Sequence, residues 1–221
     1  MLASRGTPRT TLARAMPHSN AGTKLPTKIS QSHRLHQRCV ALGRRLNSPP
    51  PIARSLESLG VSAAFADEFE LSRQYLDEAL ILWRESGSPR GVALTLKGLA
   101  MLEERVGNLP EAERLYRESL ALYQEVGEAS AVVAGFCALG ELAEKRGEPA
   151  AAARDFTAAA AVHERSEGSA GRGSELVKRL TKLRRRLGEA AFQAAAREGR
   201  ALAPEGAARG GAPDVAVAGS R

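Results

Sequence analysis

One segment of this 221-residue chain is written three times at a fixed step of 40 residues. Residues 70–88 read ELSRQYLDEALILWRESGS, residues 110–128 read PEAERLYRESLALYQEVGE, and residues 151–169, one position into the third copy, read AAARDFTAAAAVHERSEGS. A repeat of this length is typical of a solenoid, in which no unit can bury its apolar side alone and each packs against the next. The sequence therefore predicts a stack over residues 52–168. Its units span about 52–88, 90–128 and 130–168.

Each unit has the pattern of two amphipathic helices separated by a turn. In residues 91–107, Leu96, Leu99 and Ala100 share one helical face, and Gly107 followed by Pro110 marks a helix end and a new start. Small residues in register let the helices approach, and large ones fill the space between pairs. The packing residues are Leu99, Ala100, Ala112, Tyr116, Ser119, Leu139, Gly140, Ala152, Phe156 and Ala159. We therefore expect an all-α fold of about three stacked helix pairs.

The small–large–small spacing Ala112…Tyr116…Ser119 resembles the tetratricopeptide repeat, although Glu103 puts a charge where the flanking units have alanine. The step of 40 and the Glu-x-Gly unit ends resemble the repeats of large bacterial ATP-binding signalling regulators of the LuxR/AfsR type. The stretch LRRRLGEAAFQAAAREGRAL, residues 183–202, is similar to their closing segment. The resemblance implies a right-handed superhelix that binds proteins. It also implies a stand-alone or truncated piece of such a regulator, whose partner is an ATPase or regulator module encoded separately.

The N-terminal segment, residues 1–51, has no sustained apolar period and is predicted to be disordered. Residues 1–53 carry nine Lys and Arg and no acid, whereas residues 54–168 carry twelve bases and twenty acids. The acid-free start matches an organelle transit peptide as well as an unstructured tail or a start codon placed too early, so an organelle is the alternative to the bacterial cytoplasm. His33, His36 and Cys39 are spaced like half a zinc site but lack a fourth ligand, so we expect no metal.

After residue 168 the sequence predicts a hinge at 169–174 and a helical closing segment over 174–203, with residues 204–221 disordered. Ser174 is expected to cap a helix whose stripe is Leu176, Leu180, Leu183 and Leu187. This helix should cover the last repeat and present a basic face. The basic residues are Lys178, Arg179, Lys182, Arg184, Arg185 and Arg186. Nucleic-acid binding through residues 174–187 is the alternative function, but no aromatic residues are interleaved for base stacking.

The sequence carries none of the motifs of nucleotide, zinc or hydrolase chemistry that we sought. It has no Gly-Lys-Ser/Thr phosphate loop, no His-Glu-x-x-His, no Cys-x-x-Cys and no Gly-x-Ser-x-Gly. Neither an apolar run of transmembrane length nor a signal peptide is recognisable. We therefore expect a protein without enzymatic activity, cofactor or membrane span.

The leading hypothesis is a binding groove lined by the first helix of each unit. The groove face at residues 91–107 recurs 40 residues later. The predicted groove residues are Leu94, Lys97, Met101, Glu104, Arg105, Glu141, Glu144 and Lys145. A mixed-charge face of this kind suits a peptide or helix from a partner protein.

Overall fold

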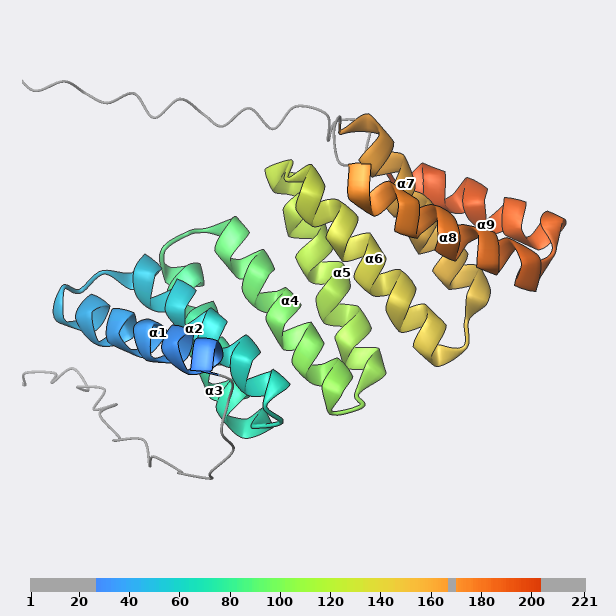
Figure 1. Cartoon of the computed structure of the whole chain (residues 1–221). Helices are drawn as coiled ribbons and strands as arrows, with labels where there is room; N and C mark the ends of the chain where they lie inside the picture. The colour runs from blue at the N-terminus through green and yellow to red at the C-terminus, as the bar shows by residue number, and fades with distance from the viewer. Residues whose placement is uncertain (1–26, 167–169, 204–221) are drawn as a thin grey trace, which may run out of the picture.

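The computed structural model describes residues 27–166 and 170–203, and within these ranges all regular structure is α-helical. The helices are α1 (Thr27–Arg45), α2 (Pro49–Phe65), α3 (Phe69–Glu85), α4 (Pro89–Arg105), α5 (Leu109–Val126), α6 (Ala129–Arg146), α7 (Pro149–Arg165), α8 (Ala170–Leu187) and α9 (Glu189–Leu202). They follow one another in chain order from one end of the molecule to the other (Figure 1). The predicted all-α fold of stacked helix pairs is confirmed.

Three antiparallel pairs form the stack: α2 with α3, α4 with α5, and α6 with α7. The second helix of each pair also packs against the first helix of the next pair. Leu76 of α3 shows both contacts, because a Cβ added to Gly60 of its own pair or to Gly98 of the next would come within 3 Å of its side chain. Leu76 is fully buried. Close packing of this kind turns three pairs into one continuous core.

The turns recur every 20 residues, which explains the step of 40. Six residues in the left-handed region occupy them: Asn47, Asp67, Gly87, Gly107, Gly127 and Gly147. After each one, the next amide donates a hydrogen bond to the carbonyl five residues back, as from Glu68 to Ala63 at 2.9 Å and from Glu148 to Ala143 at 2.9 Å. This is a Schellman-type helix end. Asp67, at a turn whose sequence has no glycine, adopts the same conformation with a φ of 60°.

The prediction of disorder over residues 1–51 is wrong for Thr27–Arg45, which form α1; residues 1–26 lie outside the described residues. This helix is stabilised by tertiary packing, since Val40 is buried against α2 and a Cβ on Gly43 would meet Ile52 at 2.6 Å. The three prolines Pro49, Pro50 and Pro51 open α2, with Pro49 as its first residue and Ser48 at the N-cap position.

At the other end of the stack, α8 and α9 both pack against α7. Helix α8 begins at Ala170, so the predicted hinge at 169–174 is wrong from residue 170 onward, and Ser174 lies inside the helix instead of capping it. Leu176 and Leu183 of the predicted stripe are buried. The predicted tail 204–221 lies outside the described residues. No helix in the described part of the chain combines the length and the apolar character that crossing a membrane requires.

Candidate functional site

The predicted groove residues lie on the first helices of two neighbouring pairs. Five of them, between Leu94 and Arg105, belong to α4, and the other three, between Glu141 and Lys145, belong to α6. We call the side of α2, α4, α6 and α8 that carries these positions the first-helix face. Leu94, Lys97 and Met101 are half-buried on it.

Most charged residues of the first-helix face are paired with one another across successive helices. Arg105 of α4 bonds Asp67 at the end of α2, with Nη2 2.6 Å from Oδ1. Lys145 of α6 bonds Glu104 of α4. Arg179 of α8 then bonds Glu144 at 2.8 Å and Glu141 at 3.1 Å, both on α6. We call this series the ion-pair ladder; it leaves five of the eight predicted groove residues already engaged within the chain.

Three aromatic side chains contact the ladder, and two of them, Tyr116 and Phe156, belong to the buried core. The Arg105 guanidinium lies over the Phe65 ring, 5.3 Å from its centroid, and Arg179 lies 5.2 Å from that of Phe156. The Tyr116 hydroxyl donates a hydrogen bond to Glu104 at 2.9 Å. Burial, reinforced by the Glu104 carboxylate, raises the pKa of Tyr116 above its usual range. Tyr116 and Phe156, predicted only as packing residues, therefore also hold ladder charges in place.

A second charged group lies toward the N-terminal ends of the first helices, and sequence reasoning missed it. Arg90 at the start of α4 bonds Glu128 at the start of α6 at 2.7 and 3.1 Å. Glu57 of α2 is buried, with Arg54 3.7 Å away and its Oε2 atom without a hydrogen-bond partner among the described residues. Burial raises the pKa of Glu57 to about 7, against the opposing effect of Arg54, Lys97 and Arg90. The step of 40 places Glu57 in register with Lys97, which is the signal that could have found it.

Apolar side chains lie on the same face, beside these charges. Val61, Leu94, Met101 and Cys137 are half-buried, and the last three pack against the main core. Val61 and Met101 occupy the same position in consecutive units. On the first-helix face these apolar side chains alternate with charged ones: most of the charges are paired within the chain, and Lys97 lies between Leu94 and Met101.

Residues 51–125 match the tetratricopeptide repeat family. The match covers α2 to α5 and supports a tetratricopeptide-repeat protein, a class whose repeats generally mediate contacts between proteins. A comparison with curated proteins finds no match. Since the family match ends before α6, the resemblance of residues 183–202 to the closing segment of ATP-binding regulators stays a prediction.

At the C-terminal end of the helical stack, the six predicted basic residues do not form one patch. Arg179 belongs to the ladder, and Arg184 bonds Glu189 at 2.8 Å. The others lie along an open hollow of about 530 Å³ on α8, which Val177 and Thr181 also line. These four bases are Lys178, Lys182, Arg185 and Arg186. Lys178 lies 3.8 Å from Glu175, so Lys182, Arg185 and Arg186 are the predicted bases that have no ion pair among the described residues.

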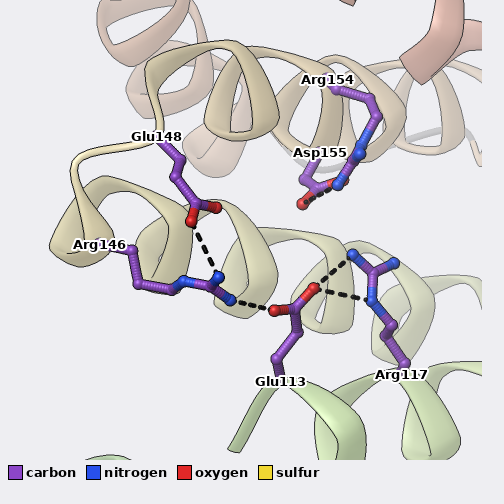
Figure 2. A network of polar contacts seen from close by, with 6 residues as sticks. All are labelled: Glu113, Arg117, Arg146, Glu148, Arg154 and Asp155. Carbon is purple, nitrogen blue, oxygen red and sulfur yellow. Dashed lines mark hydrogen bonds and ion pairs between the residues drawn. The ribbon is translucent and has the colours of Figure 1, made fainter. Parts of the chain in front are cut away.

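A further polar network joins α5, α6 and α7 (Figure 2). Glu113 accepts two hydrogen bonds from Arg117, at 2.7 and 3.1 Å, and one from Arg146, which also pairs with Glu148 at 2.9 Å. The hydrogen bond from Arg117 lowers the pKa of Glu113. The enclosed cavity beside this network measures only about 10 Å³, room for one water molecule at most. The network therefore braces the stack and offers no ligand site.

The cysteine and histidine cluster of the N-terminal segment lies on α1, where Cys39 is exposed and His33 and His36 are half-buried. Throughout residues 27–166 and 170–203, no three His, Cys, Asp or Glu side chains are grouped so that they could hold a metal ion.

Proposed function

We propose that this chain is a non-catalytic scaffold that binds a segment of a partner protein on the first-helix face. The observation that carries the proposal is the set of half-buried apolar side chains on successive first helices, beside charges most of which are already paired within the chain. Contact with a partner would complete the burial of Leu94 and Met101 without breaking the ladder. A surface that gains burial without losing ion pairs favours association.

Lys97 sets the charge that the partner should bring. It is half-buried on α4 and has no ion pair among the described residues, whereas its neighbours Glu104 and Arg105 are both paired. Burial raises the pKa of the neighbouring Glu57 carboxyl, so this group is a weaker acid than usual and offsets Lys97 only in part. We therefore expect an apolar partner segment with an acidic residue placed to reach Lys97.

Site-specific photo-cross-linking tests this surface against every protein that the cell offers. A photoreactive amino acid is placed at Lys97 or Met101, and at Ile81 as a control on the second helix α3, where the side chain is 55% exposed. We expect protein adducts in cells from positions 97 and 101 and none from position 81. Adducts from position 81 alone, or equally from all three, would overturn the proposal.

A charge reversal adds a second readout. Lys97→Glu changes the face without breaking a pair, whereas a change at Arg105 would also cut the ladder and release Phe65. Lys97→Glu should weaken adduct formation at Met101 by about tenfold or more while leaving the circular dichroism spectrum unchanged.

The proposed setting is bacterial signalling in the cytoplasm, as a stand-alone or truncated arm that contacts a separately encoded ATPase or regulator. This rests on the resemblance of residues 183–202. An ATPase encoded in the adjacent reading frame that is captured at Met101 would support it. Capture of unrelated proteins only would overturn this setting and leave the scaffold in place.

The alternative function, nucleic-acid binding, is favoured by one feature, the basic hollow on α8. Lys182, Arg185 and Arg186 are exposed there and have no ion pair among the described residues. Gel shifts at low and high salt test it, because phosphate contacts weaken steeply with salt. A shift that is lost in Lys182→Glu/Arg185→Glu would establish this function. No shift at low salt would exclude it.

A further inference from the structure

An uncovered apolar stripe runs along α1, at the opposite end of the stack from α8 and α9. Leu35, Leu42 and Leu46 are 56%, 53% and 67% exposed, and the exposed Cys39 lies between the first two. Their spacing of i, i+4, i+7 and i+11 places all four on one face of the helix. Exposed leucines scattered singly need no explanation, but four apolar positions in one line mark a contact surface.

The register of the stack shows what kind of element fits this stripe. Helix α1 precedes α3 by one step of 40 and packs on α2 in the way that the second helix of each pair packs on the first helix of the next pair. In α3, the positions that correspond to Leu35 and Leu42 are Tyr75 and Leu82, and both pack against the cluster that contains Val40 of α1. The stripe therefore faces the place where a preceding helix would stack. No described residue covers it, whereas α8 and α9 cover the other end.

The charges beside the stripe indicate the chemistry of a helix that would pack on it. The sequence of α1, TKISQSHRLHQRCVALGRR, contains no acidic residue. Arg38 and Arg45 flank one side of the stripe and have no ion pair among the described residues, whereas Arg44 is held by Glu78 at 2.7 Å. A helix packed on the stripe with acidic side chains along that edge would pair with both arginines.

The other two possible occupants fit the charge less well. Residues 1–26 carry four Lys and Arg and no acidic residue, so this segment would add like charge to α1. A second copy placed α1 against α1 would bring Arg38 and Arg45 of both chains together. Like charges in a contact of this kind oppose association.

We propose that the exposed face of α1 docks an acidic amphipathic helix from a partner protein. The apolar side of that helix packs on Leu35, Leu42 and Leu46, and its Asp or Glu residues pair with Arg38 and Arg45. This surface is independent of the first-helix face, so a failure of either proposal leaves the other standing.

The probe is a synthetic helical peptide of about 18 residues with leucines at the i, i+4, i+7, i+11 spacing and glutamates beside them. The matched controls are the same composition in scrambled order and a version with lysine in place of glutamate. Binding to the full 221-residue chain is measured by fluorescence anisotropy. Alkylation of Cys39, with the half-buried Cys137 as an internal reference, shows whether the stripe is covered.

We expect the acidic amphipathic peptide to bind at least about tenfold more tightly than either control and to slow alkylation of Cys39 but not of Cys137. Leu42→Asp and Arg38→Glu/Arg45→Glu should each weaken binding about tenfold, while Ile81→Asp on α3 leaves it unchanged. Circular dichroism and the unfolding midpoint confirm that each variant is folded. The residues changed in the stripe variants are exposed in the parent chain, so the spectra and unfolding midpoints of these variants should match those of the parent.

Three results would overturn the proposal. If the scrambled peptide binds as tightly as the amphipathic one, charge attraction alone explains the binding. Binding without protection of Cys39 would place the peptide elsewhere. Slow alkylation of Cys39 in the chain alone would mean that the stripe is already covered, by a second copy if the rate depends on protein concentration and by residues 1–26 if it does not.

Discussion

Glu103 offers the sharpest test of the packing, because it buries a charge where the flanking units carry Ala63 and Ala143. Its side chain is 8% exposed and is bonded by Arg73 of α3 and, at 2.8 Å, by the amide of Asn108. Arg73 is 43% exposed and can return to water when its partner is removed. Removing Glu103 should therefore destabilise the fold less than removing Arg73, and single substitutions test this.

Arg73→Ala leaves a buried carboxylate with one neutral donor, which should cost about 2–3 kcal/mol in the free energy of unfolding. Glu103→Ala removes the buried charge itself and restores the residue of the neighbouring units. It should cost at most about 1 kcal/mol, and the double variant should cost little more than Glu103→Ala alone. Urea denaturation followed by far-ultraviolet circular dichroism measures all three. A larger loss in Glu103→Ala than in Arg73→Ala would refute the reasoning.

Three further changes test other parts of the structure. Because burial raises the folded-state pKa of Glu57 to about 7 from 4.5, the folded chain keeps a proton that the unfolded chain releases, so the free energy of unfolding should fall as pH rises between these values. Glu57→Gln removes that dependence and should be more stable than the parent at pH 8 by up to about 3 kcal/mol, but not below pH 4.5. The same pH dependence of the free energy of unfolding in both proteins would contradict this. Gly107→Ala forces a side chain to a φ of 86° with open space around it, so thermal unfolding should show a backbone cost of about 1–2 kcal/mol, and an unchanged midpoint would count against the turn geometry. A Cβ at Gly199 of α9 would lie 2.1 Å from the Arg154 carbonyl oxygen of α7, so Gly199→Ala should displace α9 and speed tryptic cleavage within it, whereas Ala194→Ser at an exposed position should not.

The repeating core could be predicted from the sequence because its signals are periodic. The small and large residues that meet in the core recur at one step, and five of the six turns were marked by a glycine or an asparagine tolerant of left-handed backbone. The sixth, Asp67, follows the same geometry without the glycine signal.

Helix α1 was missed although Leu35, Cys39, Leu42 and Leu46 have helical spacing. Its buried contacts are few and belong to another helix: Val40 and Gly43 face α2, while the three leucines stay exposed. The start of α8 was missed for a related reason. Gly171 and Gly173 disfavour a helix, but Gly173 packs near the His163 ring, 3.4 Å from a Cβ at that position.

The predicted groove residues share one face of the stack, but the sequence did not show how their charges are paired. Reasoning from one helix at a time counts Glu104, Arg105 and Lys145 as available charges. In the stack their partners lie 38 to 41 residues away in sequence, about one step along the solenoid. Arg179, assigned by sequence to a basic patch, reaches back 35 residues to Glu144. Pairing of this kind becomes predictable only when successive units are placed side by side.

The central claim is that the first helices together form one protein-binding surface. Hydrogen exchange on the complex with a partner captured at Met101 tests it most directly. We predict added protection in α2 and α4 and in the facing part of α6, with α3 and α5 unchanged, so that protection alternates along the chain with the step of the repeat. Protection concentrated in α3 and α5, or spread evenly over both helices of each pair, would contradict the account.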